Sequence, residues 1–476
     1  MAGAPGFGPH SYEIITAQIT SDRNPGNVMD ITQAISGISL YEHLEIPYMT
    51  GELTLIDTVD IMNMMGYRGT EKFTFSARYG NPEFSFGTFD KTFIITSVQK
   101  SMKTNDNVEV ILMAMVEESF FLGSLDTVSR EFTGKPNVII DNILKNSKSG
   151  KTLEVRGTPE VQTDMRYLAP YVSSFTAMDI VRDASTTQEG LPFFLYSTPW
   201  EKDKLFYESL DNMLSSGTIV SSYAPFRYSL YSTGLSDAHL NGRFGGDGNI
   251  DPRERGNDQR RQVAKLEHAS SFIERYSVTN THNTLSMIQR GNIGSRREFV
   301  NINEFDFREQ HFSIKETLDR LKPKMPTRQQ RMSYDEVSHG GMHTKDSRNI
   351  TNIFASHTYT DFMNNIYDTG PELGGFLPLH STKDALKHMM ETTAIDIQVP
   401  GYHFWPKAGG DTNRSIGRLI PLRFFNNDTE FEGRTGNSST IDPERSGEYL
   451  MFAANHMFST EKYSVALTAV KYSNLD

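Results

Sequence analysis

The chain has 476 residues, no cysteine and a net charge of -12 at pH 7. This length predicts roughly two to four folded units, and the lack of cysteine excludes disulfides, thiol catalysis and cysteine-based zinc or iron–sulfur sites. The acidic balance argues against a general nucleic-acid binder, although it suits a wall past which DNA slides. No stretch reaches the ~18 apolar residues of a membrane span, and the N-terminus lacks a signal-peptide pattern. We therefore expect a soluble protein, made in a cytoplasm, with no membrane partner.

Residues 1–11 are rich in glycine and proline, and we expect them to form a mobile arm. Residues 12–130 carry short runs in which apolar and polar residues alternate, with β-branched and aromatic side chains and with turn residues between them. The expected strands are 12–20, 35–40, 51–57, 72–79, 92–100 and 107–116. So many strands in so short a segment predict a small antiparallel β-barrel or sandwich, and we expect the barrel.

Between two of these strands, residues 60–66 carry three methionines, Met62, Met64 and Met65. Such methionines fill gaps in a core more often than they mark a partner surface. We keep them as candidate interface residues beside that simpler interpretation.

Residues 131–190 change to a helical period and are interpreted as a helical insert. The first helix is expected over 137–146. The second is expected over 173–185, where Thr176 and Asp179 stand three residues apart as in a capping box.

A second β-barrel is expected in two parts. Residues 191–310 form the first part, with strands expected at 191–195, 204–210, 272–279, 284–289 and 297–307, and with an exposed loop at 232–262. Residues 311–394 form an insert of a loop and a helix, the helix spanning 381–392 with Ser381 or Thr382 as its N-cap. Residues 395–476 supply the closing strands, expected at 395–399, 415–425, 448–458 and 463–472. The fold class is thus mainly β with α insertions (α+β), built from two small antiparallel β-barrel modules.

No motif in the sequence supports catalysis. Residues 149–152 (SGKT) imitate the end of a phosphate-binding loop, but Lys145 stands where its first glycine is needed. The adjacent acids Glu117-Glu118 and the pair Asp57/Asp60 show no spacing that singles out an acid and a base. No Gly-x-Ser-x-Gly or His-Glu-x-x-His pattern occurs. We expect no enzyme activity, no catalytic residue and no cofactor.

One metal cluster is conceivable, and we do not expect it to bind metal. His339 and His343 flank two glycines, with Asp335 and His357 nearby, and a solvated polar loop explains them better than a metal site.

A local basic segment carries Arg253, Arg255, Arg260 and Arg261, interleaved with acidic residues. It is either a solvated loop or a loop that docks onto another protein. These arginines complete the set of candidate interface residues.

The order of the parts resembles a known family. The segments that carry the resemblance are 31–44 (ITQAISGISLYEHL), 49–57 (MTGELTLID), 93–100 (FIITSVQK), 108–116, 175–184 followed by 191–195 (LPFFL), 417–424 (GRLIPLRF) and 450–470. Together they resemble the central hub protein of T4-like contractile phage baseplates, a family related to the N-terminal region of type VI secretion spike proteins.

The resemblance implies a homotrimer in which two β-modules per subunit form a pseudo-six-fold ring. Such a hub is a structural virion protein of the tail baseplate, assembled in the host cytoplasm. It acts as a symmetry adaptor between a six-fold tail tube and a three-fold spike. Its implied partners are the spike protein, the tube protein and neighbouring baseplate wedge proteins, and DNA passes through its channel without specific binding.

Two alternatives stay open. The first is a β-rich carbohydrate hydrolase or depolymerase, with Trp200, Tyr402 and Trp405 lining a cleft, although core packing is the commoner role of such residues. The second is a type VI secretion-like spike component, which would ordinarily continue into a C-terminal needle; the chain stops at Asp476.

Overall fold

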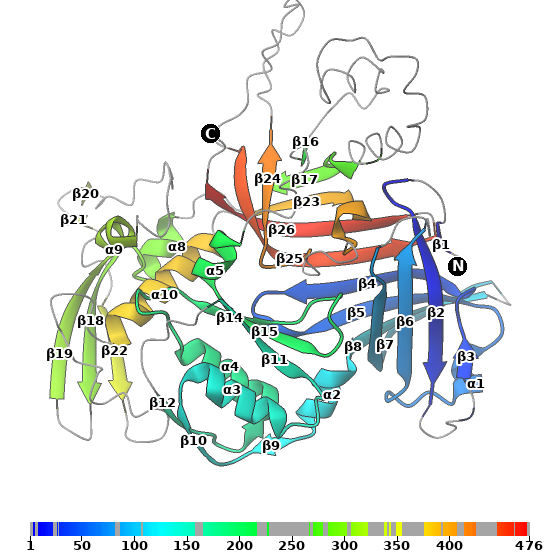
Figure 1. Cartoon of the computed structure of the whole chain (residues 1–476), viewed down its shortest axis with the longest axis horizontal. Coiled ribbons are helices and arrows are strands. Elements are labelled where there is room, and N and C mark those ends of the chain that lie inside the picture. Colours follow the sequence, from blue (N-terminus) through cyan, green and yellow to red (C-terminus); the bar gives the residue numbers. More distant parts are fainter. Residues whose placement is uncertain are drawn as a thin grey trace, which may run out of the picture.

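The protein is mainly β, and it is organised around one large sheet that runs through both halves of the chain (Figure 1). The computed structural model describes residues 3–4, 8–21, 26, 28–80, 86–105, 108–157, 165–216, 226–227, 266, 270–278, 284–301, 306–321, 338–339, 342–343, 349–354, 376–391, 394–406, 414–424, 445–460 and 462–473. A helical insert and a third, smaller β-unit pack around the large sheet.

The large sheet has 14 strands, and its main path is antiparallel throughout. In spatial order the path is β1 (Gly3–Ala4), β2 (Tyr12–Thr20), β6 (Lys72–Tyr79), β7 (Phe89–Asn105), β8 (Val108–Glu117), β5 (Ile46–Asp57), β4 (Ile35–His43), β25 (Gly447–Ser459), β26 (Tyr463–Ser473), β23 (Ala394–Pro400) and β17 (Arg275–Val278). Three short strands lie off this path: β3 (Val28–Asp30) beside β2, β24 (Leu419–Arg423) beside β25, and β16 (Phe226–Arg227) beside β24. The strands expected in 12–116 and the hairpin expected near the C-terminus are confirmed.

The two halves of the chain meet where β4 pairs with β25, a contact that we call the seam. Its register runs from Gly37 opposite Ser459 to His43 opposite Ala453. The prediction of two separate barrels is therefore wrong: within the described residues the strands form one continuous sheet and no closed barrel. Period-two alternation tells which face of a strand is buried, but it does not tell which strand lies beside it.

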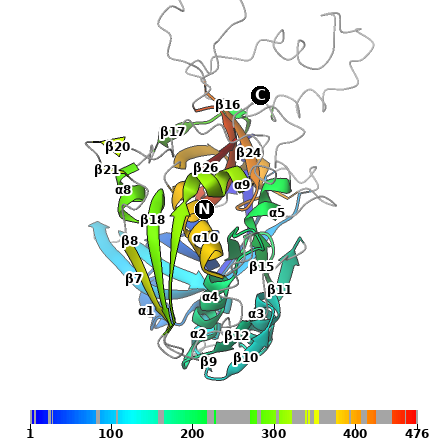
Figure 2. The ribbon, with the colours of Figure 1, turned by 90° about the vertical axis from the view of Figure 1, so that its left-hand side faces the viewer.

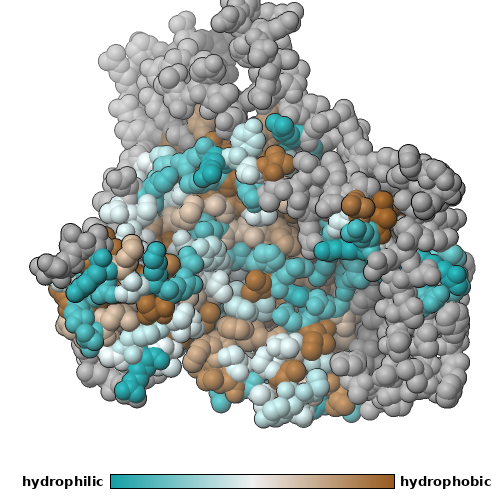
Figure 3. All heavy atoms as spheres, turned by 180° about the vertical axis from the view of Figure 1, so that it is seen from behind, coloured by the Kyte–Doolittle hydropathy of each residue, from teal (hydrophilic) through white to brown (hydrophobic). Residues whose placement is uncertain are grey.

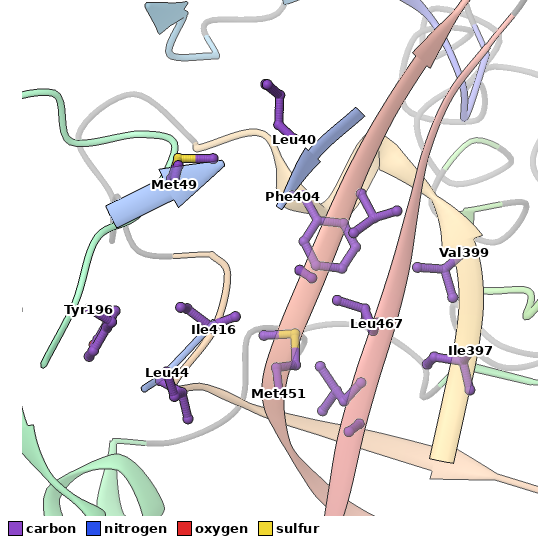
Figure 4. Close-up of a cluster of buried hydrophobic side chains, with 14 of the residues drawn as sticks. Leu40, Leu44, Met49, Tyr196, Ile397, Val399, Phe404, Ile416, Met451 and Leu467 are labelled. Atoms are coloured by element: carbon purple, nitrogen blue, oxygen red, sulfur yellow. The ribbon is translucent and has the colours of Figure 1, made fainter. Parts of the chain in front are cut away.

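The sheet curls, so that β2 and β6 lie over the end of β25. The Tyr12 and Phe458 rings pack edge to face with centroids 5.3 Å apart, and the Tyr12 hydroxyl donates to the carbonyl of Ser459. Phe75 packs on the same phenylalanine at 5.2 Å. Side chains thus fill the curl into one core, and Figure 4 shows Leu44 of the N-terminal half beside Ile416 of the C-terminal half.

The helical insert packs two helices on a small sheet. Its elements are α2 (Glu118–Ser124), α3 (Pro136–Lys145), α4 (Ser174–Ala184), α5 (Leu210–Ser215), the sheet β11 (Thr152–Arg156), β15 (Lys204–Ser209) and β14 (Phe193–Tyr196), and two short strand pairs, β9 (Thr127–Val128) with β13 (Val172–Ser173) and β10 (Glu131–Gly134) with β12 (Met165–Leu168). Both helices were expected. The cap of α4 is Ser173, whose Oγ accepts the Thr176 N–H at 3.2 Å, and the expected Thr176–Asp179 capping box is not formed.

Strands β14 and β15 belong to this insert, although their residues were expected in the second barrel. Both faces of β14 are buried: Phe193 and Leu195 join the core under α3 and α4, whereas Phe194 and Tyr196 join the core of the large sheet. An unbroken apolar run is typical of a strand that is covered on both faces, and residues 191–195 carry that pattern.

A third unit lies at one end of the molecule (Figures 1 and 2). It holds α8 (Thr284–Gln289), α9 (Ile314–Leu321), α10 (Phe376–Glu391), the sheet β19 (Asp306–Ser313), β18 (Gly294–Asn301) and β22 (Asn349–Phe354), and the pair β20 (Ser338–His339) and β21 (Met342–His343). The strand expected at 284–289 is wrong, because these residues form α8; so short an apolar run does not distinguish helix from strand. Helix α10 begins before the expected cap, and Ser381 and Thr382 are buried within it. Its Lys387 pairs with Glu45 at the β4–β5 turn, with a Nζ–Oε1 distance of 2.9 Å.

A short helix and residues 8–11 near the N-terminus pack against the C-terminal half of the sheet. The 3-10 helix η3 (Gly401–Phe404) follows β23 and packs on β26. Residues 8–11, expected in a mobile arm, make defined backbone hydrogen bonds, for example from Tyr402 N to Pro9 O at 3.1 Å. Within the described part of the chain, no helix combines the length and the apolar character that crossing a membrane requires.

Gly401 tests the packing between η3 and β26. A Cβ built on this glycine would overlap the ring of Tyr463, which is itself fully buried. We expect Gly401→Ala to lower the free energy of unfolding by ~1–3 kcal/mol, because a packed ring must move. The urea midpoint measures the change.

Gly37→Ala is the matched control, since the nearest atom to its added Cβ would be the carbonyl oxygen of Phe458 at 3.8 Å. It should change stability by less than ~0.5 kcal/mol. Equal midpoints for the two variants would contradict the packing described here.

Candidate functional site

The face of the large sheet that points away from its core is the most extended feature that both halves of the chain share. We call it the open face and define it by the half-exposed or exposed outward residues of five adjacent strands. These are Val110, Leu112, Ala114 and Val116 of β8; Thr50, Glu52, Thr54 and Ile56 of β5; Gly37, Ser39 and Tyr41 of β4; Ala453, Asn455, Met457 and Ser459 of β25; and Ala466 and Thr468 of β26.

The register aligns these residues in rows across the seam. Ala114 lies opposite Glu52, Glu52 opposite Ser39, and Ser39 opposite Met457. A single row therefore crosses from the N-terminal half to the C-terminal half without a gap in the sheet.

Within these five strands the open face is almost free of charge. Charged residues follow on the flanking strands: the exposed Lys100 of β7 lies opposite Leu112, and Asp396 of β23 lies opposite Thr468 and accepts a hydrogen bond from its hydroxyl at 2.7 Å. Glu52 is the one charged residue of the set, and its Oε2 accepts a hydrogen bond from the Tyr41 hydroxyl at 3.2 Å. The other side chains are small, hydroxylated or apolar, so the face offers no cluster of cations for phosphate groups. Its chemistry suits a smooth wall better than a binding site.

The molecular surface seen from behind is mixed. Figure 3, which views the molecule from behind, shows hydrophilic and hydrophobic side chains interspersed over the described residues. Exposed apolar residues that occur singly are normal on a soluble protein and carry no functional meaning by themselves.

The three methionines identified in the sequence lie on the short helix α1 (Ile61–Met65). Met62 and Met65 pack against the main core and are partly buried, whereas Met64 is 60% exposed. Of the three, Met64 is the one whose side chain is mostly exposed. The arginines Arg253, Arg255, Arg260 and Arg261 lie outside the described residues.

The loop that presents Met64 is held by two buried carboxylates. Asp57 accepts the N–H groups of Val59 at 2.9 Å and Ile61 at 2.7 Å. On the other side, Glu71 accepts the Arg68 N–H at 2.9 Å. Asp57 is thus a structural residue that satisfies backbone donors, not half of a catalytic pair.

A buried ionic group, Lys91–Glu117–Lys151, connects the large sheet with the insert. Glu117 Oε1 lies 2.9 Å from Lys91 Nζ and 2.8 Å from Lys151 Nζ, and all three side chains are almost fully buried. The second oxygen, Oε2, accepts from Met49 N at 3.1 Å and from Ser197 Oγ at 3.3 Å. The carboxylate of Glu117, at the end of β8, therefore binds groups from four other places: β5, β7, the residue before β11 and the loop after β14.

The charges of this group determine its titration. Burial by itself raises the pKa of Glu117, but the adjacent Lys151 and Lys91 outweigh it and lower that pKa from 4.5 to about 2. Burial lowers the pKa of Lys151 to about 8, against the opposing pull of Glu117. Lys151 comes from the segment that imitates a phosphate-binding loop, and its ammonium group is occupied by Glu117 and by Ser197 Oγ at 2.7 Å.

A second buried polar group lies at the seam. His456 of β25 places Nε2 2.9 Å from Oε1 of Glu42 on β4, and its Nδ1 lies 2.8 Å from the Tyr463 hydroxyl. The Ser415 hydroxyl also donates to Glu42. Burial raises the pKa of Glu42. Ser415 bonds to the carboxylate rather than to the imidazole, so the group lacks the nucleophile–base contact of a hydrolase.

The aromatic residues of the hydrolase alternative do not line a cleft. Trp405 and Tyr402 are buried, and Trp405 packs on Trp200 with ring centroids 5.3 Å apart. Glu118 forms a surface ion pair with Lys72. Within the described residues no three His, Asp or Glu side chains are grouped as metal ligands; of the histidine cluster only the backbone of His339 and His343 is described, and Asp335 and His357 lie outside.

Sequence reasoning missed the two buried polar groups, although a signal was present. Lys91 stands between Phe89 and Phe93 at the core-facing positions of its strand, and Glu42 stands between Leu40 and Leu44 in the same way. A charge at an inward position of an alternating strand predicts a buried partner, because an unpaired charge is expensive to bury.

Comparisons with known proteins find structural similarity to tail and secretion proteins. No protein-family model and no curated protein matches it. Among solved structures it is similar to the tail protein from Neisseria meningitidis MC58, with 11% identity, a TM-score of 0.44 and coverage of 97% of this chain and 96% of that one. It is also similar to the 43 kDa tail protein of prophage MuSo2 from Shewanella oneidensis, with 9% identity, a TM-score of 0.47 and coverage of 97% and 98%.

A third similar structure is the E. coli c3393 protein, described as a component of the type VI secretion system, with 7% identity, a TM-score of 0.39 and coverage of 98% of this chain and 77% of that one. These are the kinds of protein to which the sequence resemblance points. At such identities and TM-scores, the function proposed below rests on the geometry of this chain.

Glu117→Gln tests the ionic group. The substitution leaves Lys91 and Lys151 buried without an anion, so we expect a loss of ~3–5 kcal/mol in the free energy of unfolding at pH 7, measured by urea denaturation. Glu118→Gln is the matched control: it breaks one half-exposed ion pair and should cost no more than ~1 kcal/mol. Similar losses in both variants would contradict the role given to Glu117.

The same pair of variants has a defined pH dependence. Because the pKa of Glu117 in the folded protein is lowered from 4.5 to about 2, its contribution is fully present above about pH 4.5 and is lost as the pH falls toward 2. The wild-type and Glu118→Gln proteins should both show this acid-dependent loss in urea midpoints. Glu117→Gln should show a flatter profile over that range.

Proposed function

We propose that the protein is a structural subunit of a contractile tail, namely the central hub of the baseplate that joins a six-fold tail tube to a three-fold spike. The observation that carries this proposal is the single sheet that crosses the seam and presents one open face from both halves of the chain. The proposed location is the tail of the virion, with assembly in the host cytoplasm.

The strand order supplies the argument about symmetry. Four strands of the N-terminal half, in the order β7-β8-β5-β4, adjoin four strands of the C-terminal half, in the order β25-β26-β23-β17. Each set contains a long antiparallel hairpin, β7–β8 in the first and β25–β26 in the second. Three copies of the chain would place six such sets around an axis, which is the number that a six-fold tube needs.

The chemistry of the open face supports a conduit. DNA that must move through a channel is held back by lysine and arginine side chains, because each phosphate contact adds favourable free energy. In its five strands the open face carries uncharged side chains and Glu52, and the whole chain has a net charge of -12. Such a wall repels or ignores phosphate groups, so DNA would pass without specific binding.

The proposed partners are those that the resemblance to a baseplate hub implies. A spike protein would bind at one end of the ring, the tube protein at the other, and baseplate wedge proteins around the outside, where Met64 is available for contact. The edges of the sheet would pair or pack between subunits, which protects them from uncontrolled association. The proposal needs no cofactor and no catalytic residue.

The first test is the mass of the purified chain in solution. Three subunits of 53.8 kDa give roughly 160 kDa, and we expect light scattering to report that value across a dilution series. A monomer at every concentration that also fails to assemble with spike protein would overturn the proposal.

A second test asks whether the open face lines a closed channel. The triple variant Ser39→Lys, Thr54→Lys and Ala466→Lys adds cations to β4, β5 and β26. In the trimer these lysines should bind linear duplex DNA at low salt but not closed circular DNA, because a closed channel can be entered only from an end.

The matched control places lysines at Thr127, Ser129 and Asn146, exposed positions of the insert. It should bind linear and circular DNA equally. If the open-face variant also binds circular DNA equally well, the open face lies on the outside of the assembly and the conduit is wrong.

A further inference from the structure

The N-terminus is fastened across the opening of the curled sheet by residues 8–11, which we call the N-terminal latch. Ser11 N donates to Gly8 O at 3.2 Å and closes the turn. The Tyr79 hydroxyl of β6 donates to the same carbonyl at 3.0 Å. The latch therefore starts from the N-terminal half of the sheet.

The other side of the latch is bound to the C-terminal half. Tyr402 N donates to Pro9 O at 3.1 Å, and Tyr463 N donates to His10 O at 3.0 Å. These bonds join η3 and β26 to the start of β2. At this place β2 and β25 contact each other through side chains, and among the described residues they are not paired by backbone hydrogen bonds.

Each nitrogen of the His10 ring lies within hydrogen-bond distance of an oxygen that can accept a hydrogen bond. Its Nδ1 lies 3.1 Å from the carbonyl oxygen of Tyr463, and its Nε2 lies 2.9 Å from Oε1 of Glu274. A carbonyl and a carboxylate accept hydrogen bonds but do not donate them. A neutral imidazole has one N–H, so only the protonated ring satisfies both contacts.

One carboxylate, that of Glu274, faces the His10 ring. The titratable and charged side chains on the elements packed around it are Tyr12, Tyr79, Glu274, Arg275, Tyr402, His403, Lys462 and Tyr463. Glu274 faces His10 directly, and Lys462 pairs with its other oxygen at 3.7 Å. The hydrogen bond from His10 is the main reason that the pKa of Glu274 lies below its ordinary value.

We propose that His10 makes the latch dependent on protonation. The protonated ring holds both Tyr463 O and Glu274, and loss of its proton breaks one of the two contacts and loosens residues 8–11 from the C-terminal half. The latch is therefore tighter in acidic solution, where the ring is protonated, than in alkaline solution. This inference is independent of the hub proposal.

Hydrogen exchange of the amides of Tyr402 and Tyr463 reads the latch directly, since both donate to latch carbonyls. After correction for intrinsic exchange rates, we expect their protection in the wild-type protein to fall roughly tenfold between pH 5.5 and pH 8, as for the loss of a charged hydrogen bond. His10→Gln should show low protection at both pH values. His311→Gln is the matched control, an exposed histidine of β19 near Glu309, and should behave as wild type.

Glu274→Gln gives the opposite prediction. The amide of glutamine can donate to an unprotonated Nε2 while Nδ1–H donates to Tyr463 O, so a neutral His10 keeps both contacts. Protection should therefore stay high at both pH values. If Glu274→Gln retains the wild-type pH dependence, or if His10→Gln retains it, the proposal is wrong.

Discussion

The seam between β4 and β25 is the contact on which the rest of the architecture depends. It joins strands that are separated by about 400 residues in the chain, and it converts two sets of strands into one sheet. Both its backbone ladder and its side chains contribute. Ile38 lies opposite Phe458 in the core. Further along the same two strands, Glu42 of β4 contacts His456 of β25 on the same buried face. An ion pair or charged hydrogen bond that is buried at a strand pairing adds little net stability, but it fixes the register, because a slip of two residues would keep Glu42 on the buried face without His456 as its partner.

The other buried polar group, the one around Glu117, fixes the position of the helical insert in the same way. The insert has its own apolar core beneath α3 and α4, and β14 lies between this core and that of the large sheet. Apolar contacts of this kind tolerate small shifts, whereas the group around Glu117 does not. Two ammonium groups, a hydroxyl and a backbone N–H meet one carboxylate, and each of them loses its partner if the insert moves. Buried polar groups of this type specify one arrangement among several that would bury similar apolar area.

The open face connects this architecture to the proposed role. A sheet that is continuous across the seam can present a wall whose width comes from both halves of the chain. Its uncharged chemistry is compatible with passage of a polyanion and is unsuited to holding it. The trimer and the channel are proposals, to be tested by the mass in solution and by the binding of linear against circular DNA.

The amino-acid sequence by itself determined the local structure. Alternation in 35–57 and 72–116 correctly predicts strands and their buried faces, and the helical period correctly predicts α3 and α4. It also provides the neutral residues of the open face, since these occupy the outward positions of the same strands. The tertiary structure alone decided the partners: that β4 pairs with β25 rather than closing a barrel, that β14 and β15 join the insert, and that Lys91, Glu117 and Lys151 meet at one point. The physical reason is that hydrophobic periodicity and turn chemistry act over a few residues, whereas strand pairing and charge pairing depend on contacts between segments far apart in the chain.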